Sequence, residues 1–554
     1  MLHLMTVRDA RVVGVSYETD RMRFIGRGNT NAAPMAMKDP GPLSGSQGSV
    51  LDPIVAIRHR IILEPESSAT IDVFTGISDT RESALRLAEK YQGKRFANRA
   101  FELARTHSQV VLQQINGTEA DAQLYGRLAN YILYAHSGLR ADAAILSSNN
   151  RGQSGLWGYS ISGDLPIVLL LIKDPANIAL VRHLVQAHTY WRLKGLAVDL
   201  VIWNEEHGGY RQRLQEQILG LIAAGVETNV VDRPGGIFVR SSDQISNEDR
   251  ILIQAASRVV ISDSRGTLEE QIGGRSIPKI AIPRLQSTRF GKNNFPAMVV
   301  PRGDLLFFNG LGGFSPDGRE YIIATALDQV TPAPWTNVIA NPSFGTVVSE
   351  AGMAYTWSEN AHEFRLTPWH DDPVSDASGE VLYIRDEESG QFWSPTPLPR
   401  RGDTPYVSRH GFGYSVFEHS EQGITTEVWI YVAADAPVKF TMVKVRNESG
   451  RSRRLSVTSY AELVLGELRS KSAMHVVTEV DGGTGAIFAR NQYNTEFSGR
   501  IVFFDVAGTA GAERTLTCDR SEFIGRNGTL ENPDVMTRTK LSGKTGAALD
   551  PCAA

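Results

Sequence analysis

The chain has 554 residues, of which 42% are hydrophobic and 21% charged, a composition typical of soluble globular proteins with material for several cores. A formal net charge of −4 gives no argument for nucleic acid or acidic membranes as partners, and we expect no nucleic acid. The two cysteines, Cys518 and Cys552, are too few for a disulfide framework or a thiolate metal site, and we expect no metal or cofactor in this chain.

Residues 1–75 are predicted to be β-rich. After Pro53, two strand-like stretches cover residues 54–63 and 68–75, and part of the first alternates apolar and polar side chains as a half-buried strand does. Helical composition then covers residues 76–150, which we interpret as a helical linker. Asp79 is the predicted N-cap with Glu82 as its capping-box partner, and Asn116-Gly117 predicts a break.

Residues 151–280 alternate between two kinds of pattern. The sequence is strand-like at residues 165–172, 196–203 and 237–240 and helical at residues 178–191, 210–224 and 247–259. This alternation predicts a small α/β connector with some parallel strand pairing. Prolines predict a further linker over residues 281–300. The longest apolar run, residues 165–172, is far below the ~20 residues of a membrane-spanning helix, so we expect no transmembrane segment.

Residues 301–554 are predicted to form a large antiparallel β-sandwich, so the fold class of the whole chain is multi-domain α+β. Glycine-rich turns, ten tryptophan or tyrosine residues between positions 335 and 431, and the lack of any long helical pattern support this prediction.

The stretch from Trp335 to Trp393 is a candidate carbohydrate site, because a flat indole face stacks on a sugar ring while short polar side chains bond its hydroxyls. The candidate residues are Trp335, Asn337, Trp357, Asn360, Trp369, Asp371, Asp372 and Asp376. The alternative is that the tryptophans fill the sandwich core and the aspartates cap turns. The clustered aspartates also suggest a glycosidase carboxylate pair. Such a pair is defined by its spatial separation, so we assign no catalytic residue.

The chain also repeats itself. A segment Asp-Arg-x-x-Phe-Ile-Gly-Arg occurs at residues 20–27 and again at 519–526, and each copy is followed by Leu-Ser-Gly and Leu-Asp-Pro blocks. The offset is 499 residues for the first block and 498 for the others. We therefore expect residues 1–75 to be the C-terminal remnant of a first sandwich and residues 301–554 to be a second sandwich without its closing strands. In one alternative, the strands at 54–75 fill that vacancy.

Several blocks, in order, resemble one family. They are Asn309-Gly310-Leu311-Gly312-Gly313-Phe314, Thr331-Pro332-Ala333-Pro334-Trp335, Leu366-Thr367-Pro368-Trp369, Asp372-Pro373-Val374-Ser375-Asp376 and His410-Gly411-Phe412-Gly413-Tyr414. They resemble the supersandwich of glycoside hydrolase family 94, formerly glycosyltransferase family 36. The block Leu156-Trp157-Gly158-Tyr159-Ser160-Ile161 and the repeated segment are most similar to its cyclic β-1,2-glucan synthase group.

The resemblance implies a galactose-mutarotase-like supersandwich that binds or supports carbohydrate, followed by an (α/α)6 barrel that carries the catalytic aspartate. It also implies β-1,2-glucan or a related glucan as ligand, with inorganic phosphate or UDP-glucose engaged only by domains that this chain lacks. No residue here matches the catalytic aspartate, so we expect this chain alone not to be catalytic. His370-Asp371 and Ala361-His362 depart from the family pattern.

The leading hypothesis is a carbohydrate-binding or supporting region of a glucan-synthesising protein on the cytoplasmic side, with an inner-membrane anchor of the parent protein left open. Two alternatives stay open. One is a self-sufficient glycoside hydrolase or phosphorylase that uses sandwich-loop carboxylates. The other is a structural spacer that never meets sugar.

Overall fold

The computed structural model describes residues 1–206, 211–225, 230–273, 304–327, 329–507 and 513–554. These residues form two compact units. The first consists of Met1–Val110, Asp328–Trp335 and His370–Ala377, and the second of Val111–Leu327, Thr336–Trp369 and Ser378–Ala554. The linker predicted at residues 281–300 lies outside the described residues. Within the described ranges, no helix is both long and apolar enough to cross a membrane.

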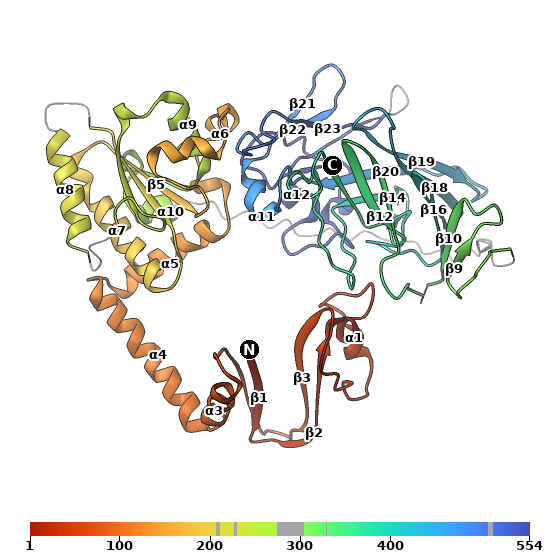
Figure 1. Cartoon of the computed structure of the whole chain (residues 1–554), viewed down its shortest axis with the longest axis horizontal. Helices are drawn as coiled ribbons and strands as arrows, with labels where there is room; N and C mark the ends of the chain where they lie inside the picture. The colour runs from red at the N-terminus through yellow and green to blue at the C-terminus, as the bar shows by residue number, and fades with distance from the viewer. Residues whose placement is uncertain (207–210, 226–229, 274–303, 328, 508–512) are drawn as a thin grey trace. The chain divides into compact units, whose positions relative to one another are not determined.

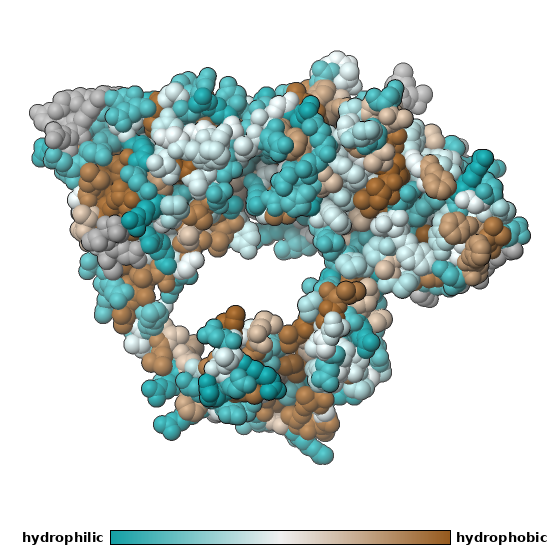
Figure 2. Space-filling view, viewed as in Figure 1, coloured by the Kyte–Doolittle hydropathy of each residue, from teal (hydrophilic) through white to brown (hydrophobic). Residues whose placement is uncertain are grey.

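The first unit is built on two antiparallel strand pairs. β1 (Leu2–Arg8) pairs with β4 (Thr70–Gly76), and β2 (Arg11–Asp20) pairs with β3 (Pro53–Ile62). The alternative in which residues 54–75 complete the second sandwich is therefore wrong, since β3 and β4 have β2 and β1 as their hydrogen-bonded neighbours. Apolar strand side chains stay open to solvent, with Val13, Val15 and Val73 exposed by 51%, 63% and 54%. Figure 2 shows such brown side chains on the surface over β2 and β3.

Two short helices and two longer ones complete this unit. They are α1 (Arg21–Ile25), α2 (Met35–Lys38), α3 (Arg81–Tyr91) and α4 (Lys94–Gln114), and the boundary between the two units falls within α4. The predicted cap of α3 is wrong by one residue: the Thr80 hydroxyl, not Asp79, accepts the hydrogen bond from the backbone N–H of Ser83. The predicted break is confirmed, since α4 ends before Asn116, whose φ of 52° lies in the left-handed region.

The second unit contains the predicted α/β module. Its four strands are all parallel and lie in the order β7-β6-β5-β8, and strands that are consecutive in the chain are joined through a helix. The strands are β5 (Ile167–Ile172), β6 (Asp199–Asn204), β7 (Ile237–Ser241) and β8 (Ser257–Ser262). The helices are α5 (Glu119–Leu133), α6 (Ala143–Ser148), α7 (Ile178–Leu193), α8 (Arg211–Ala223), α9 (Asn247–Ala256) and α10 (Leu268–Gly273). The helix predicted at 247–259 is too long, because β8 begins at Ser257.

Burial on both faces explains the nearly continuous apolar sequence of β5. Val168 and Leu170 pack on one side with side chains of α5, α7 and α8, whereas Ile167 and Leu169 pack on the other side with side chains of α6 and α9. The second cluster also includes Ala547. Two hydrogen bonds donated by arginine side chains link the module to the sandwich. Arg140 donates to the Met474 carbonyl at 2.6 Å, and Arg490 donates to the Ser147 carbonyl at 3.0 Å.

The predicted sandwich is present as four antiparallel sheets, ordered β19-β18-β17-β16-β10-β9, β11-β12-β13, β15-β14-β20-β24 and β21-β22-β23 (Figure 1). Strands of the first sheet are β9 (Gly312–Phe314), β10 (Glu320–Thr325), β16 (Tyr406–Gly411), β17 (Tyr414–Glu421), β18 (Ile424–Val432) and β19 (Lys439–Asn447). Those of the second are β11 (Thr336–Asn341), β12 (Phe344–Ser349) and β13 (Ala354–Ser358). Those of the third are β14 (Glu380–Asp386), β15 (Phe392–Trp393), β20 (Leu455–Glu462) and β24 (Cys552–Ala553). Those of the fourth are β21 (Val477–Val480), β22 (Ile487–Arg490) and β23 (Ile501–Phe504), and the helices here are the short α11 (Arg469–Ser472) and α12 (Arg520–Ile524).

The two copies of the repeated segment share one local structure. Asp20 caps α1 by accepting from the N–H of Met22, and Asp519 caps α12 by accepting from the N–H of Ser521. The N–H of Arg21 donates to the Asp52 carbonyl at 3.0 Å, and the N–H of Arg520 donates to the Asp550 carbonyl at 2.7 Å. The same two arginines form side-chain ion pairs with those aspartates. The repeat is thus a recurring structural element as well as a recurring sequence.

Candidate functional site

A row of three aromatic side chains lies on β13 and the loop after it. Tyr355 and Trp357 are two residues apart and so project from the same side of the strand. The ring centroids of Tyr355 and Trp369 are 5.0 Å apart with planes at 2°, and those of Tyr355 and Trp357 are 5.3 Å apart with planes at 33°. Tyr355 is buried, and burial raises the pKa of its phenol, whereas Trp369 is 40% exposed. The row therefore ends in an indole that is open to solvent.

Backbone geometry fixes the position of these rings. Trp357 forms an isolated bridge with Arg365, and Trp369 forms one with Ser378. Gly345 of β12 lies opposite Trp357 in the strand register. A Cβ at Gly345 would lie 2.3 Å from the Trp357 ring, so only glycine leaves room for this indole.

Hydrogen-bond donors accompany the row. The Arg365 guanidinium lies over the Trp369 ring, 5.8 Å from its centroid, and also donates to the Glu467 carbonyl. Asn360 is exposed in the loop after β13, where its Oδ1 accepts from the N–H groups of His362 and Glu363 at 2.9 and 3.0 Å. Its Nδ2 donates to no other described residue. A flat ring with donors nearby is an arrangement that suits a sugar.

Asn337 and Trp335 have different surroundings. The Asn337 amide on β11 donates to the carbonyls of Gly411 and Tyr414 at 2.9 and 2.8 Å and to the Ser415 hydroxyl at 3.2 Å. Its side chain therefore ties β11 to the β16–β17 turn. Trp335 is half-buried and belongs to the first unit.

The three predicted aspartates also belong to the first unit, where two of them form ion pairs. Asp372 accepts two parallel hydrogen bonds from Arg21, at 2.6 and 2.8 Å, and Asp376 pairs with Arg27 at 2.8 Å. The Arg27 and Asp376 side chains are only 6% and 1% exposed. Asp371 is exposed. The loop of residues 372–376 is thus a docked segment whose charges are neutralised by arginine.

The pKa of Asp372 is shifted in the opposite direction to that of a catalytic acid. Burial alone would raise its pKa, but the hydrogen bonds from Arg21 and from the N–H groups of Ser375 and Val374 lower that pKa to about 2. A glycosidase acid must hold a proton near neutral pH, which requires a raised pKa. The geometry at Asp372 therefore favours attachment of the loop over proton transfer.

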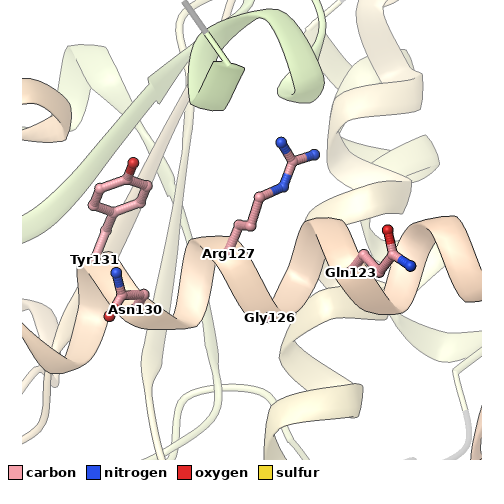
Figure 3. Close-up of a pocket in the computed structure, with 5 residues that line it drawn as sticks. All are labelled: Gln123, Gly126, Arg127, Asn130 and Tyr131. Atoms are coloured by element: carbon pink, nitrogen blue, oxygen red, sulfur yellow. The ribbon is translucent and has the colours of Figure 1, made fainter. Parts of the chain in front are cut away.

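An open pocket of about 690 Å³ lies elsewhere, along α5 of the α/β module. Its lining residues are Gln123, Gly126, Arg127, Asn130 and Tyr131, and Figure 3 shows Arg127 and Tyr131 projecting on the same side of that helix. All five come from one helix, so groups from different described elements do not converge on a ligand there. The aromatic row remains the better candidate site.

The structure thus brings together two predicted residues, Trp357 and Trp369. Sequence reasoning did not assign a role to Tyr355, which stacks on Trp369 and packs at a tilt against Trp357, or to Arg365. The alternation Tyr-x-Trp in a strand was the available signal for Tyr355. The docking arginines Arg21 and Arg27 stand in the repeated segment, but nothing local in the sequence indicates acidic partners about 350 positions away.

Comparison with known proteins gives one family and several relatives. The model of the glycosyl hydrolase 94 supersandwich domain matches residues 1–94 and 319–554. The chain is 34% identical to the cyclic beta-(1,2)-glucan synthase NdvB of Rhizobium meliloti (strain 1021) over 571 aligned residues, which cover 100% of this chain and 20% of that protein.

Two phosphorylases are similar over a shorter range. The N,N'-diacetylchitobiose phosphorylase of Vibrio furnissii is 29% identical over 44% of this chain and 30% of its own length. The solabiose phosphorylase of Paenibacillus borealis is 28% identical over 44% of this chain and 31% of its own length. The chain therefore spans between a fifth and a third of the length of these relatives.

Proposed function

This chain belongs to the glycosyl hydrolase 94 supersandwich family, and on that premise we propose that it is the carbohydrate-binding or supporting region of a protein that acts on β-1,2-glucan or a related glucan. Glucosyl transfer and phosphorylase-like control of chain length, the activities proposed for the parent protein, would take place elsewhere. Phosphate or UDP-glucose would be engaged only outside this chain. We assign no catalytic role to residues of this chain.

The observation that carries the proposal is the aromatic row. Trp369 offers a partly open indole on which Tyr355 stacks, the Arg365 guanidinium lies over the Trp369 ring, and Asn360 supplies a donor in the same loop. The named relatives, a glucan synthase and two disaccharide phosphorylases, support a carbohydrate as the ligand. The other residues predicted from the sequence are no part of this row: the Asn337 amide bonds the β16–β17 turn, and Trp335, Asp371, Asp372 and Asp376 belong to the first unit.

A galactose-mutarotase-like form of the sandwich belongs to the same proposal. Its support is the pair of larger antiparallel sheets, one of six strands and one of four. Large antiparallel sheets that pack face to face are the general architecture of such sandwiches.

Titration of the chain with linear β-1,2-glucan, followed by tryptophan fluorescence and calorimetry, tests the binding role. We expect saturable binding, and Trp369→Ala should weaken it by about fivefold or more because it removes a stacking surface worth about 1 kcal/mol. Trp157→Ala is the matched control, since Trp157 is 60% exposed and lies in the α/β module. Equal affinities of the two variants would contradict the assignment of the site.

Turnover assays distinguish the remaining possibilities. Robust cleavage of β-1,2-glucan by the purified chain, with or without phosphate, would show a self-sufficient enzyme instead. Absence of any glucan binding at millimolar concentration would favour a structural spacer.

A further inference from the structure

The first copy of the repeated segment holds an acidic loop through three groups. We define the first arginine face as Arg21, Arg27 and the backbone N–H of Gly28. Arg21 binds Asp372, Arg27 binds Asp376, and the Gly28 N–H donates to the Val374 carbonyl at 2.7 Å. Every second residue of the loop Asp372-Pro373-Val374-Ser375-Asp376 is therefore fixed by this face.

The second copy has the same backbone at this turn. Gly26 and Gly28 have φ of 81° and 76°, and their equivalents Gly525 and Asn527 have φ of 86° and 64°. Asparagine adopts such left-handed conformations more readily than most residues, which explains why it can replace glycine here. We define the second arginine face as Arg520, Arg526 and the N–H of Asn527.

The occupancy of the two faces differs. Arg27 is buried against its aspartate, whereas Arg526 is exposed and forms no hydrogen bond or ion pair with any described residue. Asn527 is exposed as well. Arg520 is 34% exposed and is shared between Glu462 and Asp550. The second face therefore presents the arginine and the N–H group that hold Asp376 and Val374 in the first copy, without the loop.

We propose that the second arginine face is a docking site for the Asp-x-x-x-Asp loop of a further supersandwich unit, supplied in trans. The chemistry is the one already used at the first face: a carboxylate bound by Arg526, and a loop carbonyl bound by the Asn527 N–H. Because the surface that binds and the loop that is bound are different, this contact is heterologous and joins supersandwich units head to tail. The proposal does not depend on carbohydrate binding.

The test uses the whole chain and a fluorescein-labelled peptide with the sequence of residues 369–378. At low ionic strength, anisotropy should show saturable binding in the millimolar range or tighter. Arg526→Ala should weaken it about tenfold or more, as should an asparagine in place of Asp376 in the peptide. Arg233→Ala is the control, since Arg233 is exposed and has no side-chain partner among the described residues.

Three outcomes would overturn the proposal. One is the absence of saturable binding up to about 5 mM peptide. Another is binding that Arg526→Ala and Arg233→Ala weaken equally. The third is self-association of the chain, seen by sedimentation and abolished by Arg526→Ala, without peptide binding, which would identify a different part of a second copy as the occupant.

Discussion

Replacing Lys439 by methionine should destabilise the sandwich by about 3–5 kcal/mol at neutral pH, the usual cost of removing one partner from a buried ion pair. The Lys439 ammonium on β19 pairs with Glu380 on β14 at 2.5 Å, and the two side chains are only 11% and 18% exposed. It also donates to the hydroxyls of Thr346 and Thr356 at 3.1 and 3.3 Å. Thr356 stands between Tyr355 and Trp357, so this pair supports the strand that carries the aromatic row.

The effect should depend on pH. Burial raises the pKa of Glu380, but Lys439 and the hydroxyls of Thr356 and Thr367 hold it below its ordinary value of 4.5. In the native protein this group therefore stabilises the fold above pH 4.5, and the contribution is lost as the pH falls through the lowered pKa. Without Lys439, burial would place the pKa above that of the unfolded chain. The loss of unfolding free energy in Lys439→Met, relative to the native chain, should then be largest at neutral pH and become smaller in acid, where Glu380 is protonated.

Urea unfolding followed by tryptophan fluorescence measures this, because five of the eight tryptophans lie between residues 335 and 429. Lys444→Met is the matched control on the same strand: Lys444 and its partner Glu427 are 57% and 32% exposed, and the loss should stay below about 1 kcal/mol. Adding Glu380→Gln to Lys439→Met should restore part of the stability. A loss at Lys439 no larger than at Lys444, or equal losses at pH 7 and in mild acid, would refute this reasoning.

Two further predictions concern the site and the docked loop. Gly345→Ala should cost about 1–3 kcal/mol of stability and change the near-ultraviolet dichroism, because the new Cβ would lie 2.3 Å from the Trp357 ring. Gly482→Ala is the control and should do neither, since no atom lies within 4 Å of its added Cβ. An unchanged spectrum for Gly345→Ala would contradict the tight fit around the Trp357 ring. Asp372→Asn should loosen the loop from Arg21, and hydrogen exchange at the Gly28 N–H, which bonds the Val374 carbonyl, should speed up. In the native chain the same loosening should occur in acid, since the stabilisation is complete above the ordinary pKa of 3.8 and disappears as the pH falls to about 2. Equal protection of this N–H in native and variant chains at neutral pH would show that the charge does not hold the loop.

The α/β module was largely predictable because each element there is defined by local pattern. The apolar run of β5 and the helical spacing of α7 each identify an element. The first residues of β8, by contrast, were predicted as part of the preceding helix. No glycine or proline marks the boundary between the end of α9 at Ala256 and the start of β8 at Ser257. Only the β-branched residues Val259, Val260 and Ile261 indicate the change to a strand.

The candidate site was predictable only in part, for a different physical reason. Tryptophan and asparagine content predicted a sugar-binding stretch, and two of its tryptophans do pack against Tyr355, one stacked and one tilted. Side-chain charge, however, does not specify its partner. The carboxylate of Asp372 is of a type that can bind a sugar hydroxyl, yet in the structure it accepts hydrogen bonds from Arg21. Only tertiary structure distinguishes these two roles, because the pair is far apart in the chain.

The order of strands in the α/β module has a consequence for how the chain folds. Its four strands lie between residues 167 and 262, and each is one helix away from the next. In the sandwich, by contrast, strands that are far apart in the sequence pair with each other: β10 pairs with β16, and β20 pairs with both β14 and β24. Because closing longer loops costs entropy before any contact forms, the module should fold first and the sandwich later. The bonds from Arg140 and Arg490 and the packing of Ala547 then give the early module a second role, as a template on which the slower β21–β23 region assembles.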